Sequence, residues 1–194
     1  MITSEEFLHK FANIISENVV KQLQNDLNNM GKEVIGLKTQ LVVANRKIDE
    51  LEQYTRKDNL RVYGIKELKG ENTNELIMNV CREKMGINIQ SSDISTSHRL
   101  RAPENGIKPI IVRFTRRDVK KQIFNFKKKL KGTQIVIKED LTARKAQLLK
   151  TAAGKLGPRA VWTSNCNIDT KWGRRYLEIR RLEDIPKKED ETHA

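Results

Sequence analysis

The segment Arg56–Glu67, RKDNLRVYGIKE, contains a run in which the character of the side chains alternates. Leu60 and Val62 fall on one side of the run, and Arg61 and Tyr63 fall on the other. This period of two is typical of a half-buried β-strand, with one side packed on a core and the other side open. The sequence therefore predicts a sheet whose open face carries an arginine beside a tyrosine.

A strict seven-residue repeat precedes this strand. Every a and d position between residues 20 and 51 is apolar. So narrow a stripe favours a left-handed coiled coil over a helix that packs on its own domain. We expect the helix to begin at Thr3 and to form a coiled-coil domain over residues 3–54. The predicted seam consists of Val20, Leu23, Leu27, Met30, Val34, Leu37, Leu41, Ala44, Ile48 and Leu51.

Charged residues beside the seam favour parallel chains. In a parallel coil, a g residue faces the e residue five places later in the neighbouring chain. Glu33 would then meet Lys38, and Lys47 would meet Glu52, so both contacts are attractive. The run KIDELE at 47–52 also has the basic–apolar–x–x–apolar–Glu pattern associated with trimers. We expect a parallel homotrimer, and the sequence leaves a dimer and a tetramer open.

Residues 57–138 are predicted to form a compact unit of strands and helices. Alternation and β-branched residues indicate strands over 59–65, 93–101, 108–115 and 133–140. A helix is expected from residue 72 or 73 to Gly86, and another between Thr115 and Gly132. The order β-α-β-β-α-β is the split βαβ plan of ferredoxin-like and RNA-recognition folds.

The second of these helices has a predicted cap and a predicted apolar side. Thr115 and Asp118 have the spacing of a capping box. The apolar side at helical spacing would consist of Val119, Ile123, Phe126 and Leu130.

The predicted open face of the sheet is basic rather than aromatic. In RNA-recognition domains, aromatic residues of the first and third strands stack on bases. Alternation here places Arg61, Tyr63, Ile111 and Arg113 outward, so arginine and isoleucine replace at least two of those aromatics. A guanidinium can stack on a base or bind phosphate with two hydrogen bonds. We therefore expect weak base-specific reading, with electrostatic attraction contributing most of the binding.

Positive charge is concentrated after the helix. The chain carries a net charge of +13, yet residues 1–55 hold six Lys and Arg against eight Asp and Glu. Between residues 99 and 131 there are twelve Lys and Arg and two acidic residues. Such asymmetry is typical of an assembly element joined to an element that binds a polyanion. Individual lysines, such as those at 127–129, could instead serve only to keep the second helix soluble.

A small α/β domain is predicted over residues 140–185. A helix capped at Thr142 would end at Gly157-Pro158, followed by strand-like runs at 159–163, 168–172 and 175–181. Trp162 could be a core anchor, or it could stack over nucleic acid beside Arg159. Residues 186–194 are polar and are predicted to form a disordered tail.

Several function classes have no support in the sequence. Cys81 and Cys166 lie far apart, and the three histidines are scattered, so we expect neither a zinc site nor a disulfide framework. No GxxxxGK[ST] loop is present, and acidic residues at strand ends and in the tail usually only solvate a chain. We expect no enzyme activity, no cofactor and no metal. No long apolar run is present, and we expect an intracellular protein that is not embedded in a membrane.

The order of these elements resembles a known family. The coil, followed by NLRVYGI (59–65), HRLR (98–101), PIIVRFT (109–115), IKEDLT (137–142) and PRAVWT (158–163), is similar to the first-open-reading-frame protein of non-LTR retrotransposons of the long interspersed element type. The resemblance covers residues 20–185. It implies a homotrimer that binds single-stranded RNA and DNA without sequence specificity and has nucleic-acid chaperone activity. It also implies cytoplasmic ribonucleoprotein particles built on the element's transcript, with the nucleus as a second location.

The resemblance also implies contact residues. They are Lys57, Asn59, Arg61, Arg99, Arg101, Lys108 and Trp162, where a family member has a tyrosine in place of the tryptophan. The basic segment, the predicted open face and the start of the C-terminal strands add Tyr63, Arg113, Arg116, Arg117, Lys120, Lys121 and Arg159.

Two alternatives to this function remain at this stage. A coiled-coil adaptor would leave the basic segment without a purpose. A factor that binds duplex DNA would need a basic region continuous with the coil, and too few basic residues lie there.

Overall fold

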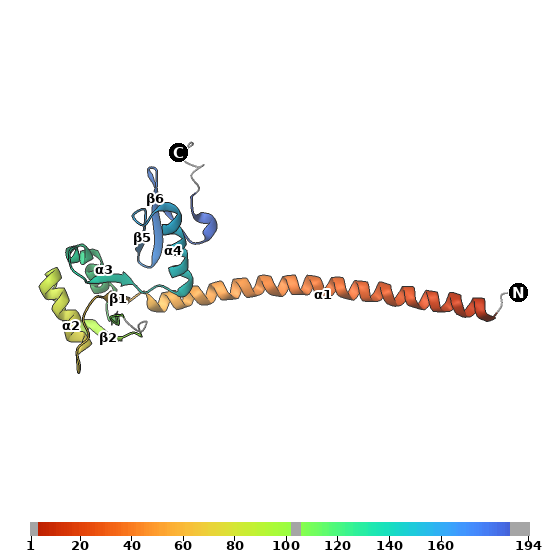
Figure 1. The fold of residues 1–194 in the computed structure, drawn as a ribbon, viewed down its shortest axis with the longest axis horizontal. Helices are drawn as coiled ribbons and strands as arrows, with labels where there is room; N and C mark the ends of the chain where they lie inside the picture. The colour runs from red at the N-terminus through yellow and green to blue at the C-terminus, as the bar shows by residue number, and fades with distance from the viewer. Residues whose placement is uncertain (1–3, 102–105, 187–194) are drawn as a thin grey trace. The chain divides into compact units, whose positions relative to one another are not determined.

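The computed structural model describes residues 4–101 and 106–186, and the chain divides into two compact units at residues 48 and 49. The first unit is helical and belongs to α1, Ser4–Arg56 (Figure 1). All ten predicted seam side chains are exposed on this single chain, Leu27 by 70% and Leu51 by 68%. The long helix is confirmed, and the residues of the predicted seam are exposed apolar side chains. The predicted start at Thr3 lies outside the described residues.

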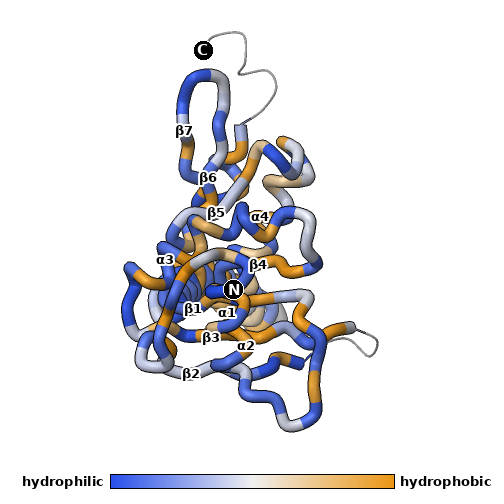
Figure 2. The backbone as a smooth tube through the Cα atoms, turned by 90° about the vertical axis from the view of Figure 1, so that its left-hand side faces the viewer, coloured by the Kyte–Doolittle hydropathy of each residue, from blue (hydrophilic) through white to orange (hydrophobic). Residues whose placement is uncertain are grey.

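The second unit begins with a four-stranded antiparallel sheet. Its strand order is β2-β3-β1-β4, so the first and third strands lie in the middle (Figure 2). Leu60 and Val62 are buried, whereas their neighbours on β1 are half-buried, as the alternation predicted. The strands are β1 (Asn59–Tyr63), β2 (Ile94–Arg99), β3 (Ile110–Phe114) and β4 (Val136–Glu139).

Two helices pack on the buried side of this sheet. α2 (Thr73–Asn79) begins at Asn72, whose side chain accepts hydrogen bonds from the backbone, and continues into a π-helical turn that ends at Gly86. α3 (Arg117–Phe126) continues into a 3₁₀ turn, Lys127–Leu130. The shared core contains Leu60, Val62, Ile77, Cys81, Met85, Ile110, Val112, Phe114, Val119, Ile123, Phe124, Leu130 and Ile137.

Two details predicted for α3 are wrong. Phe126 is 40% exposed and Phe124 is buried in its place, because Phe124 lies one turn after Lys120 on the side of the helix that also carries Val119 and Ile123. The capping box is also absent. The Thr115 hydroxyl donates to the carbonyl of Ser92, and Asp118 pairs with Arg116.

A helix and a second antiparallel sheet complete the second unit. Thr142 caps α4 as predicted, its hydroxyl accepting from the amide of Lys145. Leu148, Ala152, Val161 and Ile168 form a separate small core, and Figure 2 shows the hydropathy along these segments. The elements are α4 (Ala143–Leu156), β5 (Val161–Ser164), β6 (Asn167–Trp172) and β7 (Arg175–Glu178), with sheet order β5-β6-β7.

The coarse fold prediction is confirmed. The chain is an α+β protein in which a long N-terminal helix precedes antiparallel sheets. In the part of the chain that the structure describes, no helix has the length and apolarity needed to span a bilayer. Residues 187–194 of the predicted tail lie outside the described residues.

β1 ends two residues earlier than predicted because of Gly64. This residue has a positive φ of 85°, and a Cβ atom there would lie 2.0 Å from the backbone oxygen of Gln134. Gly70 also has a positive φ, of 74°, but nothing lies within 4 Å of its Cβ position. An alanine at Gly70 would therefore meet backbone strain alone, whereas an alanine at Gly64 would meet both strain and steric overlap.

We expect Gly64→Ala to lower the free energy of unfolding by about 3 kcal/mol, because strain and overlap with backbone act together. Gly70→Ala should cost only about 1 kcal/mol, from strain alone. Urea unfolding of both variants and the parent checks this. Equal losses for the two variants would contradict the close approach at Gly64.

Candidate nucleic-acid interface

The open face of the first sheet carries a row of side chains across all four strands. Strand register places Lys138, Arg61, Ile111 and His98 side by side, on β4, β1, β3 and β2 in turn. In the next row, Arg113 lies opposite Asn59. The predicted outward positions of β1 and β3 thus share one surface. Two adjacent cations, Lys138 and Arg61, lie there beside the apolar Ile111.

A buried carboxylate orients the arginine at the centre of this row. The side chain of Asp140 is 2% exposed, and its carboxylate accepts hydrogen bonds from Arg61 Nε at 2.6 Å, Asn59 Nδ2 at 3.0 Å and Arg56 Nη1 at 3.2 Å. The Arg61 side chain is still 31% exposed. Because a guanidinium has five N–H donors, Arg61 keeps donors for a ligand while Asp140 fixes its direction.

Tyr63 lies next to a lysine that the sequence analysis missed. Lys138 Nζ is 5.3 Å from the centre of the Tyr63 ring, within the range of a cation–π contact. Lys138 is exposed, and Tyr63 is half-buried. Alternation along β4 could have found Lys138, because it is the outward residue between Ile137 and Glu139.

A groove follows the β4 edge of the sheet. One cavity of about 460 Å³ is lined on the sheet side by Arg61, Tyr63 and Lys138, and on the C-terminal side by Lys150 and Trp162. A second cavity of about 650 Å³ shares Trp162 as a lining residue. Both cavities also include Phe124, Lys127, Glu139 and Thr163, and the second adds Arg117, Lys120, Lys121, Asn125, Lys128, Ser164 and Asn165.

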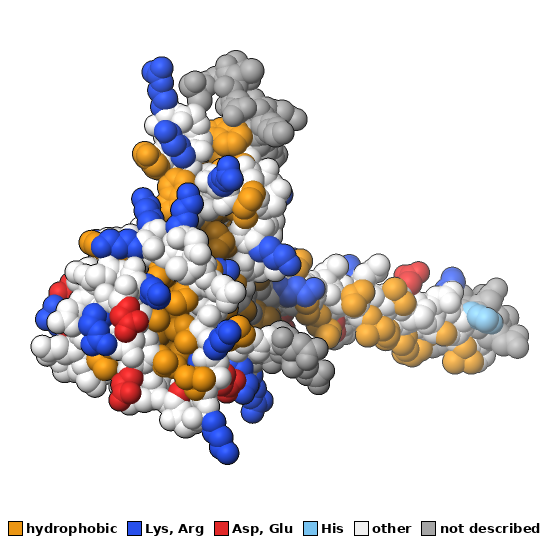
Figure 3. Space-filling view, turned by 60° about the vertical axis from the view of Figure 1, so that its left-hand side comes forward, with side chains coloured by type: hydrophobic (Ala, Val, Ile, Leu, Met, Phe, Trp, Pro, Cys, Tyr) orange, Lys and Arg blue, Asp and Glu red, His pale blue; other side chains and the backbone are white. Residues whose placement is uncertain are grey.

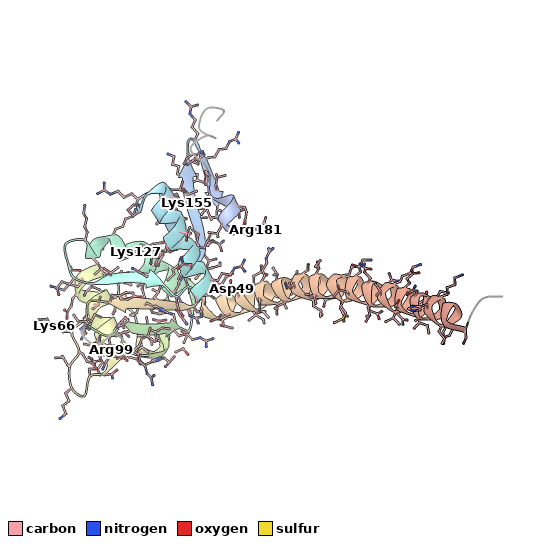
Figure 4. All side chains as sticks on the ribbon, turned by 45° about the vertical axis from the view of Figure 1, so that its right-hand side comes forward. Asp49, Lys66, Arg99, Lys127, Lys155 and Arg181 are labelled. Carbon is pink, nitrogen blue, oxygen red and sulfur yellow. The ribbon has the colours of Figure 1, made fainter. Side chains whose placement is uncertain are left out.

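The floor of the groove combines aromatic and cationic groups. Lys127 Nζ is 3.5 Å from the centre of the Phe124 ring, and burial lowers the pKa of Lys127. Figure 4 labels Lys127 at the end of α3, and Figure 3 shows apolar side chains interspersed with Lys and Arg on this unit. Trp162 is 36% exposed, so its ring is available at the groove. Aromatic and cationic groups together suit bases and phosphates.

A second buried carboxylate holds the far wall of the groove. Glu139 pairs with Lys120 at 2.5 Å, and both side chains are almost fully buried. Its other oxygen accepts from the backbone amide of Cys166 at 3.0 Å, and Lys145 Nζ donates to the Cys166 carbonyl. Burial raises the pKa of the Cys166 thiol to about 11, so it is a neutral core group. These bonds tie the β5–β6 turn to α3 and β4.

Two of the predicted contact residues are structural. Lys120 is 3% exposed and neutralises Glu139, so it is not available to a nucleic acid. Arg99 points to the helix side, where its Nε lies 2.6 Å from Glu71 and its other nitrogens donate to backbone carbonyls, among them that of Ile65. Their partners lie 19 and 28 positions away along the chain.

The remaining predicted residues lie on the surface. Ion pairs join Lys108 to Glu67, Arg116 to Asp118 and Arg117 to Asp58. Such exposed pairs contribute little to stability and can exchange for phosphate. Lys57 is half-buried, with its Nζ 5.5 Å from the Tyr54 ring centre. The other predicted residues on the surface are also exposed, and they are Arg101, Arg113, Lys121 and Arg159.

Comparison of the chain with models of known families and with curated proteins finds no match. Within residues 4–101 and 106–186, no cluster of three or more His, Cys, Asp or Glu side chains could hold a metal ion. The geometry of the groove and the open face is therefore the basis for a functional proposal.

The Arg99–Glu71 pair predicts a specific pH dependence. Hydrogen bonds from Arg99 lower the pKa of Glu71 from 4.5 to about 2. A carboxyl whose pKa is lowered by folding adds stability above its unfolded pKa, and that stability is lost as the pH falls through the folded value. We expect Glu71→Gln to destabilise the protein at pH 6, with the loss shrinking between pH 4.5 and 2.

Urea unfolding of the parent and of the variant across this pH range checks the expectation. Glu83→Gln is the control, because Glu83 is exposed and its contact with Arg82, at 4.0 Å, is long and weak. A difference between Glu71→Gln and the parent that stays constant from pH 6 to pH 2 would contradict the role of the Arg99–Glu71 pair.

Proposed function

We propose that this chain is a homo-oligomeric protein that binds single-stranded RNA and DNA and acts as a nucleic-acid chaperone. The observation that carries the proposal is the continuous surface made by the open sheet face and the groove at the β4 edge. There Arg61, Lys138 and Lys127 lie beside the partly exposed rings of Tyr63 and Trp162, with the buried Phe124 beneath Lys127. A positively charged groove with aromatic side chains is the general solution for binding single strands.

The fold of the second unit supports this proposal. Its first part has the element order β-α-β-β-α-β, with the strand order β2-β3-β1-β4 and both helices on one side. We propose that residues 57–138 are an RNA-recognition-like domain, which uses its open sheet face for nucleic acid. Because fold alone does not give function, the composition of that face is the stronger support.

The chemistry of the surface favours binding without sequence preference. Lysines and arginines contact phosphates, which every strand carries, and aromatic rings stack on any base. The arginine at the centre of the face is already held by Asp140, which limits its freedom to adapt to particular base edges. A strand held by many weak and equivalent contacts can exchange for another strand. Annealing can therefore proceed without ATP.

The exposed seam supports the second half of the proposal. Ten apolar side chains at heptad spacing are exposed on the single chain, and burying them between parallel helices would stabilise an oligomer. We propose a parallel homotrimer. Linking three modest binding faces raises the effective concentration of each one for a shared strand.

The place of this activity is proposed from the sequence resemblance. If the chain is the first-open-reading-frame protein of a long interspersed element, it coats the element's transcript in a ribonucleoprotein particle. We place these particles in the cytoplasm, with the nucleus as a second location.

We expect Lys138→Ala combined with Lys150→Ala to weaken binding of single-stranded RNA. The slope of log affinity against log salt should fall by about 1.4, because each lost phosphate contact removes about 0.7. The matched control is Lys66→Ala with Lys155→Ala. It removes the same charge from exposed lysines outside the groove (Figure 4).

Fluorescence anisotropy across a salt series measures both slopes for RNAs of unrelated sequence, with duplex DNA as the competitor. If the groove variant and the control variant lose RNA affinity and salt slope equally, the groove is not part of the binding surface. A parent protein that binds RNA no better than a neutral control protein does would overturn the function itself.

We expect Leu37→Glu to dissociate the oligomer and to reduce RNA affinity together. Leu37 is on the predicted seam, and its side chain is 55% exposed in the single chain. Ile35→Glu is the matched control, because Ile35 is 68% exposed on the same helix but off the seam. Light scattering gives the mass of each variant, and anisotropy gives its RNA affinity. If both variants keep the parent mass, or both lose it, the heptad seam is not the assembly surface.

A further inference from the structure

The open face of the second sheet carries an aromatic pair that the proposed groove does not explain. Strand register places Trp162, Asp169 and Glu178 in one outward row, and Lys171 and Tyr176 in the next. Tyr176 is 73% exposed, which is high for so large a ring.

The two rings approach each other above β6. Trp162 comes from β5 and Tyr176 from β7, yet their centroids are only 6.1 Å apart, at an interplanar angle of 79°. The Lys171 Nζ atom is 6.0 Å from the centre of the Tyr176 ring. This edge-to-face contact supports each ring while leaving most of the Tyr176 ring in solvent. The two rings thus contact each other beside a cation.

Charge on this face determines how a strand could lie there. Asp169 and Glu178 occupy the middle row, so phosphates are repelled from the centre, although Arg180 pairs with Glu178 at 2.9 Å. Lys171 is the cation of this face next to Tyr176, and Arg174 lies in the β6–β7 turn, whereas Arg175 pairs with Trp172 and belongs to the other face. Bases would therefore lie over the rings, with the phosphates toward the hairpin.

The aromatic pair is continuous with the groove. Trp162 lines both groove cavities and also contacts Tyr176, so one side chain belongs to both surfaces. A strand that leaves the groove at Trp162 would meet the Tyr176 ring next. We propose that Trp162 and Tyr176 form a stacking platform for bases of a single strand, with Lys171 neutralising the adjacent phosphate. This inference rests on the proposed function and extends its site onto the second sheet.

The test compares a normal single-stranded DNA oligonucleotide with an abasic oligonucleotide of the same length and charge, using the full-length chain. Stacking requires bases, whereas phosphate contacts do not. We expect Tyr176→Ala to weaken binding of the normal oligonucleotide about tenfold and to leave binding of the abasic one unchanged. Tyr176→Phe, which keeps the ring, should bind both as the parent does. Lys171→Ala should weaken both about equally.

The outcomes separate this platform from the function on which it rests. If the parent prefers the normal oligonucleotide and Tyr176→Ala binds both as the parent does, the platform is overturned and the groove stands. An equal loss for Tyr176→Ala on both oligonucleotides would also overturn stacking. If the parent binds neither oligonucleotide, the proposed function fails first. Circular dichroism of each variant confirms folding, which the exposure of Tyr176 should preserve.

Discussion

The ion pairs of the buried Asp140 carboxylate hold together three segments of the second unit. It is almost fully buried, and its charge is balanced by Arg56 and Arg61. Gln53 adds two hydrogen bonds at the same place, donating to the Asp140 carbonyl and accepting from the amide of Thr142. The last turn of α1, the first strand and the start of α4 thus meet at one charged group. Removing it would leave Arg61 without its carboxylate partner, whereas Arg56 would keep Glu52.

Two successive carboxylates at the end of β4 have complementary tasks: Glu139 is the last residue of the strand, and Asp140 directly follows it. Glu139 turns toward α3, where it binds Lys120 and the amide of Cys166. Asp140 lies beside the open face and orients Arg61. Glu139 therefore holds the β5–β6 turn beside the groove, and Asp140 holds Arg61 in place. The proposed binding surface is preorganised by groups that do not themselves reach a ligand.

The sequence predicted the elements better than it predicted the surface. Alternation located the strands of residues 4–101 and 106–186, because that signal is local: Leu60 and Val62 are buried. The cap at Thr142 located the start of α4, whereas the one predicted at Thr115 is absent. The roles of Arg99 and Lys120 could not be read in the same way, since their partners are distant in the chain. A lysine that binds phosphate and one that neutralises a buried glutamate look alike in a sequence. Only the folded chain distinguishes them.

The groove lysines Lys138 and Lys150 are exposed, and the described structure gives neither of them an ion pair. A substitution that removes one cation while another arises on a nearby exposed position would keep the field at the groove almost unchanged. Over evolutionary time the positive charge could therefore move between positions, while Glu139 and Asp140 could not. Chains of this architecture should diverge quickly at the ligand surface and slowly beneath it. This is the reverse of the pattern expected for an enzyme active site.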